Sequence, residues 1–194
     1  MAEDLEPEDI QKQFNTNVLG TMKVTQAMLP HFRTRKTGRI VFMSSLSGWI
    51  GHPGNAAYAS SKFAIEGYAE SLSAETAPLG IKTLLIEPGM FRTRLFASNN
   101  LQAKQSSIPE YADFSKGMLD YMSSQNGKQP GDPSKLVAIV LDLVRQEGKA
   151  SGREVPLRLP LGSDCTAAIR AKCEETLQVL DKWQDVCEST DIAQ

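Results

Sequence analysis

Tyr58 and Lys62 lie four residues apart in the segment Tyr-Ala-Ser-Ser-Lys, and Ser45 precedes the tyrosine by thirteen residues. Residues at the first spacing share one face of a helix, so the Lys62 ammonium group can approach the Tyr58 phenol. A nearby cation favours the phenolate and lowers the pKa of a tyrosine, which makes it a usable general acid or base. The pair therefore points to proton transfer at a carbonyl or an alcohol. The alternative is a half-buried helix tyrosine beside a solvated lysine.

Two apolar segments that end in polar turns predict where these residues lie. Residues 38–43 read as a strand that breaks into the turn containing Ser45, and residues 81–86 read as a strand that ends in Glu87-Pro88-Gly89. Thr93 follows that glycine by four residues. Ligands of doubly wound sheets lie at the carboxyl ends of the strands, so Ser45 and Thr93 are candidate binding residues. Either one could instead be an ordinary turn residue.

Further elements are predicted from apolar periodicity and from end signals. Pro30 is expected to end the first helix, and Pro156 and Pro160 place the last strand at a sheet edge. The predicted helices cover residues 7–29, 56–77, 133–147 and 163–187, and the last strand covers residues 154–161. One face of the last helix carries apolar side chains that we interpret as core packing, with a partner groove as the alternative: Ile169, Cys173, Leu177, Leu180 and Trp183.

Four motifs together resemble the carboxyl-terminal two-thirds of a classical short-chain dehydrogenase/reductase, from about residue 8 to about residue 160. They are Asn17-Val-Leu-Gly, Ser44-Ser45, Tyr58-xxx-Lys62 and Pro88-Gly89-Met-Phe91-Arg-Thr93. The resemblance implies an α/β, Rossmann-like, doubly wound parallel sheet. It also implies hydride transfer between a carbonyl or alcohol substrate and a nicotinamide cofactor, NADP or NAD, with NADP slightly favoured.

The resemblance also implies a role for each matching residue. Tyr58 would exchange a proton with the substrate oxygen, and Ser45 would hydrogen-bond the same oxygen. Lys62 would lower the pKa of Tyr58 and hold the ribose hydroxyls, and Asn17 would fix a water that relays protons to the lysine. Tyr58, Lys62, Pro88, Gly89, Phe91 and Thr93 would contact the cofactor. The helices over residues 7–29 and 56–77 would form a homo-oligomer interface.

Residues 93–132 are rich in Ser, Gln, Asn, Lys and Gly, and they resemble the mobile substrate lid of the family. Several large side chains there could cover an apolar ligand, or could instead attach short helices to the body: Phe96, Tyr111, Phe114, Met118 and Tyr121. The segment therefore predicts where substrate specificity would be decided.

The chain departs from the family pattern in one respect. It carries no Thr-Gly-xxx-Gly-x-Gly turn and no Asn-Asn-Ala-Gly turn, so a partial domain of three strands is expected over residues 1–194, with a frayed tail over 188–194. The strand around Val41 would then be an unpaired apolar edge. One alternative function is a catalytically silent remnant that pairs with a full-length homologue. Another is non-redox chemistry, such as epimerisation or dehydration, at the same tyrosine and lysine.

Composition narrows the class of protein. A net charge of −2 and a pI near 5.8 predict no nucleic-acid partner, and no apolar run is long enough to predict a membrane span. Three cysteines without metal-ligand spacing predict reduced thiols in the cytoplasm, and His31 and His52 are too few to predict a metal site. The expected protein is a cytoplasmic enzyme that acts on a small molecule.

Overall fold

A three-stranded parallel sheet is the centre of the computed structural model, which describes residues 1–97 and 104–192. The strands are β1 (Gly38–Met43), β2 (Ile81–Pro88) and β3 (Arg158–Leu161), in the order β1-β2-β3. Gly38 pairs with Ile81 and Met43 with Ile86, while Leu85 pairs with Arg158. Because all three strands are parallel, their carboxyl ends meet at one edge of the sheet. This architecture confirms the predicted α/β fold class.

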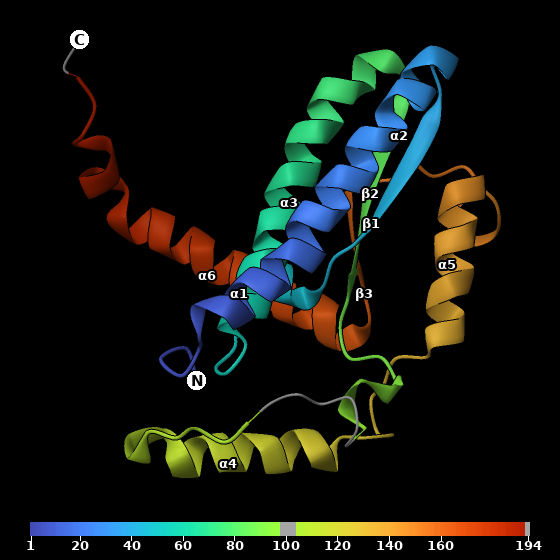
Figure 1. Ribbon diagram of the computed structural model, residues 1–194. Coiled ribbons are helices and arrows are strands. Elements are labelled where there is room, and N and C mark those ends of the chain that lie inside the picture. The colour runs from blue at the N-terminus through green and yellow to red at the C-terminus, as the bar shows by residue number, and fades with distance from the viewer. Residues whose placement is uncertain (98–103, 193–194) are drawn as a thin grey trace.

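Helices cover both faces of the sheet (Figure 1). One face is covered by α1, a π-helical turn η1, α2 and α3, and the other by α5. The described helices are α1 (Pro7–Phe14), η1 (Asn15–Gly20), α2 (Thr21–Arg35), α3 (Ala56–Thr76), α4 (Pro109–Ser124), α5 (Pro133–Arg145) and α6 (Ser163–Glu188).

Neighbouring residues of β2 face the two layers in turn, as a strand buried on both sides must. Leu85 packs with Val18, Ile65 and Leu72 on the α3 side, whereas Leu84 and Ile86 pack with Leu143 on the α5 side. All three β2 side chains are fully buried. The central strand therefore links two hydrophobic cores, and its carboxyl end is held rigidly between them.

The first helix does not end at Pro30 as predicted. Pro30 lies inside α2, which continues to Arg35 and ends where Lys36 adopts a left-handed conformation with φ of 52°. Proline removes one backbone hydrogen bond, but Pro30 is exposed, so the released carbonyl can bind water. The prediction that the helix starts at Pro7 is confirmed.

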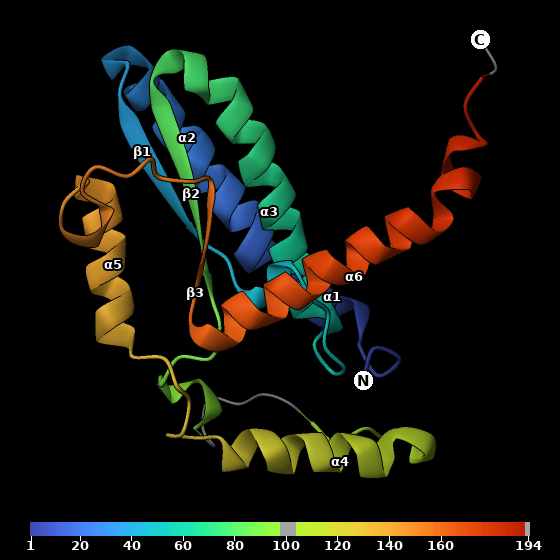
Figure 2. The ribbon, with the colours of Figure 1, turned by 180° about the vertical axis from the view of Figure 1, so that it is seen from behind.

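The carboxyl-terminal helix corrects a second prediction. Ile169 is buried, but Leu177, Leu180 and Trp183 are 59%, 54% and 50% exposed, and Cys173 is exposed too. Figures 1 and 2 show why: α6 begins beside β3 and then runs away from the body. At 26 residues the helix is about 39 Å long, which exceeds the region that it packs against. Core packing was therefore the wrong interpretation beyond Ile169.

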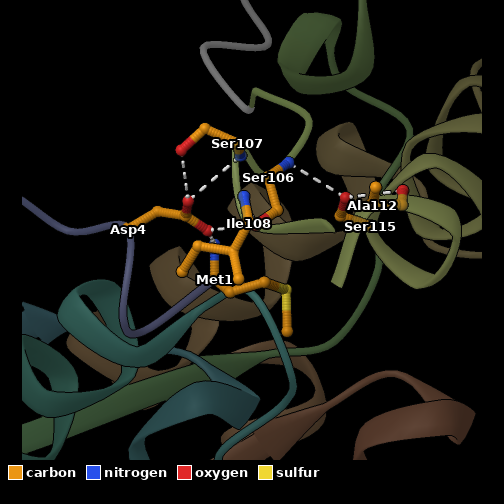
Figure 3. A network of polar contacts seen from close by, with 7 residues as sticks. All are labelled: Met1, Asp4, Ser106, Ser107, Ile108, Ala112 and Ser115. Carbon is orange, nitrogen blue, oxygen red and sulfur yellow. Dashed lines mark hydrogen bonds and ion pairs between the residues drawn. The ribbon is translucent and has the colours of Figure 1, made fainter. Parts of the chain in front are cut away.

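The amino-terminal segment is tied to the loop before α4 (Figure 3). The Asp4 carboxylate accepts hydrogen bonds from the Ser106 hydroxyl at 2.7 Å and from the Ser107 backbone N–H at 3.2 Å, and it pairs with the Met1 ammonium group at 2.8 Å. These contacts hold the pKa of Asp4 well below its usual range. The Ser106 N–H donates to the Ser115 hydroxyl at 2.9 Å, so the network anchors one end of the predicted lid.

Parts of two predictions lie outside the described residues, namely positions 98–103 of the lid and 193–194 of the tail. Within the described part of the predicted lid segment, residues 109–124 form the helix α4, where Phe114 and Tyr121 are 54% and 59% exposed. The last strand starts at Arg158 rather than at residue 154, and it pairs only with β2 within the described chain. No helix in the described ranges is long and apolar enough to span a bilayer.

Candidate functional site

Tyr58 and Lys62 occupy successive turns at the start of α3. The Lys62 Nζ atom lies 5.5 Å from the centre of the Tyr58 ring and donates a hydrogen bond of 2.8 Å to the carbonyl of Met43, the last residue of β1. Burial lowers the pKa of Lys62, and the negative charge of Glu66 opposes this shift. The lysine is therefore fixed between the helix and the carboxyl end of a strand, beside the tyrosine.

Ser45 lies in the turn that follows β1. Its extended backbone, with φ of −168°, caps the short 3-10 turn η2 (Leu46–Gly48), and its Oγ atom accepts a hydrogen bond of 3.1 Å from the Ser47 N–H. This bond occupies a lone pair of the hydroxyl, so its O–H group can donate elsewhere. The Asn55 side chain donates to the Ser47 hydroxyl at 3.1 Å. The turn is thereby tied to the residue that precedes α3.

Asn17 reaches the same helix from the π-helical turn η1. Its side-chain amide donates a hydrogen bond of 3.0 Å to the Ser61 hydroxyl, which in turn donates at 2.7 Å to the Tyr58 carbonyl. Ser61 is fully buried. Single π-helical turns inside α-helices often occur at functional sites. Sequence reasoning missed Ser61, although it lies inside the Tyr-Ala-Ser-Ser-Lys segment.

The turn after β2 holds the remaining candidate residues. The Gly89 N–H donates to the Leu161 carbonyl at 2.9 Å, and the Met90 N–H donates to the Asp164 carboxylate at 2.6 Å. A Cβ atom on Gly89 would lie 2.4 Å from both Asp164 oxygens, so the close approach of this carboxylate requires glycine. Pro88 is the last residue of β2 and pairs with Leu161.

Phe91 and Thr93 lie farther along this turn. Phe91 forms an isolated parallel bridge with Gly131, and Thr93 is exposed, with its Oγ1 atom accepting a hydrogen bond of 3.3 Å from the Leu95 N–H. The structure thus brings Asn17, Ser45, Tyr58 and Lys62 to the carboxyl end of β1. The second group lies at the carboxyl end of β2, the neighbouring strand in the same sheet.

Residues 1–104 match the profile of the short chain dehydrogenase family, which is more than half of the chain. The chain belongs to the short-chain dehydrogenase family. An uncharacterized oxidoreductase of Bacillus subtilis, YusZ, is 35% identical to it over 162 residues. That match covers 82% of this chain and 56% of the relative.

Solved structures agree with this assignment. A short-chain dehydrogenase from Streptomyces avermitilis is 31% identical, with a TM-score of 0.79 that covers 98% of this chain and 65% of that one. A gluconate 5-dehydrogenase from Burkholderia cenocepacia, in complex with NADP and tartrate, has a TM-score of 0.62 at 22% identity over 86% of this chain and 59% of that one, which shows the shared fold. The chain therefore spans between about half and two-thirds of the length of these proteins.

The donor groups at the site suit one end of a nicotinamide cofactor. The Lys62 ammonium group and the hydroxyls of Ser45, Tyr58 and Thr93 can bind ribose hydroxyls and a carboxamide. At Gly89 the missing side chain leaves the backbone open to close approach at the end of β2. A pyrophosphate usually lies at a glycine-rich turn between a strand and a helix, and this sequence has no such turn. The residues present therefore fit the nicotinamide and its ribose, but not the phosphates.

Proposed function

We propose that this short-chain dehydrogenase carries the catalytic half of an NAD(P)-dependent oxidoreductase that interconverts a carbonyl and an alcohol. The observation that carries the proposal is the Lys62 ammonium group, fixed by the Met43 carbonyl and 5.5 Å from the Tyr58 ring. The Tyr58 hydroxyl is a group that can exchange a proton with a substrate oxygen, and the ammonium group beside the ring supplies positive charge where the proton would leave. Ser45 lies at the end of the same strand, where it can share the substrate oxygen.

In the direction of reduction, Tyr58 donates its proton to the substrate oxygen as negative charge develops there. The Ser45 O–H group hydrogen-bonds the same oxygen and stabilises that charge. Lys62 stabilises the phenolate that remains and binds ribose hydroxyls. Asn17 and Ser61 position the start of α3, so they act through Tyr58 rather than on the substrate.

The cofactor would be held by Lys62, Tyr58 and the Pro88–Thr93 turn, and when bound it supplies or accepts a hydride. The related gluconate 5-dehydrogenase binds NADP, which supports a nicotinamide cofactor for this chain. NADP is slightly favoured over NAD, and a cytoplasmic location is part of the same proposal. The substrate would be a small carbonyl compound or alcohol that enters beneath α4.

The first test replaces the tyrosine hydroxyl. Tyr58→Phe should lower kcat for NADPH-dependent reduction of a carbonyl substrate by about 10²–10⁴-fold, because the proton donor is lost while the ring is kept. Tyr68→Phe is the matched control, since Tyr68 lies on the same helix but packs edge-on against Phe42 in the core. Equal activity of wild type and Tyr58→Phe would contradict the proposal.

A second candidate function is a catalytically silent remnant that pairs with a full-length homologue. It is favoured by the free edge of β1, which pairs only with β2 among the described strands, and by apolar side chains exposed on α2 and α3. These are Val24 at 67%, Met28 at 43% and Phe63 at 47%. The same helices would serve a homo-oligomer. A chain that binds no nucleotide but co-purifies with a complete homologue would favour this candidate.

A further inference from the structure

A pair of buried carboxyl groups lies beneath both turns of the proposed site. Glu87 of β2 is fully buried and Glu66 of α3 is 5% exposed. Arg158 of β3 reaches both, with its Nε atom 2.9 Å from Glu66 Oε2 and 3.8 Å from Glu87 Oε1. The same guanidinium also binds Glu70, an exposed residue on α3, at 2.8 Å. Three carboxyl groups therefore converge on one arginine.

Among the described residues, several buried polar atoms of this cluster lack a hydrogen-bond partner. Both carboxyl oxygens of Glu87, the Oε1 atom of Glu66, the indole nitrogen of Trp49 and the Ser44 hydroxyl are buried without a partner at normal hydrogen-bond distance. Two buried carboxylates side by side are strongly unfavourable when both are ionised. A proton held by one of them removes a negative charge and supplies a donor to the other.

The groups around the pair do not supply a second buried counter-charge. Lys62 lies one helical turn before Glu66 but is fixed on the Met43 carbonyl, and the Arg158 guanidinium also faces the Trp49 ring at 5.7 Å. From α6, the Cys165 thiol donates to the Glu87 carbonyl at 3.1 Å, and burial with the charges of Glu87 and Asp164 raises its pKa to about 12. A thiol with a raised pKa stays neutral, so Cys165 supplies no counter-charge to the Glu87 carboxyl group.

We propose that Glu66 and Glu87 share a single proton and that, in this protonated state, the pair is a positioning device for the Ser45 turn and the Pro88–Gly89 turn. Burial raises the pKa of Glu87 to about 7, and Glu66 adds to the rise, whereas Trp49 and Arg158 oppose it. The shared proton therefore titrates in the range where a cytoplasmic enzyme works.

The link to the site runs through backbone contacts and rests on the proposed function. Gly48 follows Ser45 by three residues and packs directly on Glu66, where a Cβ atom on the glycine would lie 2.9 Å from Glu66 Cγ and 3.0 Å from Glu66 Oε1. Glu87 immediately precedes Pro88 and Gly89. Repulsion within an ionised pair would therefore displace the two turns that carry Ser45 and Thr93.

Infrared spectroscopy tests the shared proton without reference to activity. The folded wild-type chain should show the carbonyl stretch of a buried protonated carboxyl group at about pH 6, and the band should disappear by about pH 9. Glu87→Gln should remove the band, Glu66→Gln should move its disappearance to lower pH, and Glu70→Gln, the exposed partner of the same arginine, should leave it unchanged. Absence of the band in folded wild type, its survival in Glu87→Gln, or an unchanged pH dependence in Glu66→Gln would overturn the shared proton.

Hydrogen exchange tests the positioning role. After correction for intrinsic exchange, protection of amides in residues 44–50 and 88–93 should fall at least tenfold in wild type between about pH 6 and about pH 9, and should stay constant in Glu87→Gln. Equal pH dependence in both proteins would overturn positioning. If wild type lacks nucleotide binding while both results hold, the proposed function fails and the proton pair stands.

Discussion

At the residue scale, the site depends on contacts that spacing alone only partly reveals. The Tyr58 and Lys62 spacing predicted a shared helix face, and the ammonium group indeed lies beside the ring. Lys62 donates its hydrogen bond to the backbone carbonyl of Met43. Every residue type has such a carbonyl, so the sequence could not predict this acceptor. The buried hydroxyl of Ser61 was missed because a serine three residues after a tyrosine cannot be told from a turn or surface residue before its burial is known.

The Asn17–Ser61 contact gives a prediction at this scale. A double-mutant cycle of Asn17→Ala and Ser61→Ala should give a coupling free energy of unfolding of about 0.5–1.5 kcal/mol, the usual net value of one hydrogen bond. Chemical denaturation of the four proteins measures it. The exposed pair Lys116 and Asp120 on α4 is the control cycle, where about 0.5 kcal/mol or less is expected. A coupling of zero between Asn17 and Ser61 would contradict the link from η1 to α3.

At the element scale, the fold was largely predictable because its local signals agree. The strands over residues 38–43 and 81–86, the helix that starts at Pro7 and the helix that starts after Asp132 all show clear periodicity or end signals. The Asp132 side chain accepts hydrogen bonds from the first backbone N–H groups of α5. The π-helical turn η1 could not be predicted. Its hydrogen bonds span five residues instead of four, and over a single turn this difference does not change the apolar pattern visibly. The prediction that the helix ends at Pro30 was wrong because this proline is exposed to solvent. Water can bind the backbone carbonyl that the proline leaves without a partner, so the helix continues.

The fit of η2 against α3 gives a prediction about packing between elements. Gly48→Ala should lower the free energy of unfolding by about 1–3 kcal/mol, because the added methyl group would lie 2.9 Å from Ser44 Oγ and Glu66 Cγ. Gly51→Ala, three residues later, has no neighbouring atom within 4 Å and should change stability by about 0.5 kcal/mol or less. Thermal unfolding compares the two. Equal effects would show that η2 is not held against Glu66.

The raised pKa of the Glu87 carboxyl group gives a prediction for how the free energy of unfolding depends on pH. Its pKa is about 7 in the folded chain and 4.5 in an unfolded reference, so between these values the folded state binds more protons. Stability should therefore fall as pH rises from about 4.5 to about 7, and this contribution should level off above that range. Glu87→Gln should flatten the slope, as measured by denaturant midpoints across the range. An unchanged slope would contradict the raised pKa.

At the scale of the whole molecule, exposed apolar side chains gather on α2, on α5 and on the far half of α6. Which apolar helix faces stay uncovered could not be predicted from the periodicity of the sequence. The stripe on α6 has the same spacing as a core stripe, and only the direction of the helix shows that it leaves the body. An amphipathic pattern states which face is apolar and not what covers it.

The proposed homo-oligomer belongs to this scale. Val24→Lys together with Met28→Lys should convert an oligomer into a monomer, because both side chains are exposed on α2 and charges are depleted from interface cores. Light scattering coupled to size-exclusion chromatography measures the mass. Leu177→Lys with Leu180→Lys on α6 is the control pair and should leave the mass unchanged. Loss of the oligomer only in the α6 variant would place the interface on α6 instead.

The most direct test of the central claim is a fluorescence titration of the 194-residue chain with NADPH and NADH, with its oligomeric state recorded in the same sample. We expect saturable binding that Lys62→Met weakens by about tenfold or more, equivalent to ~1.4 kcal/mol. Lys82→Met is the matched control, because Lys82 is an exposed residue near the opposite end of β2 and should leave binding unchanged. A folded chain that binds neither nucleotide, or binding that Lys62→Met leaves intact, would contradict a nicotinamide site at Tyr58 and Lys62.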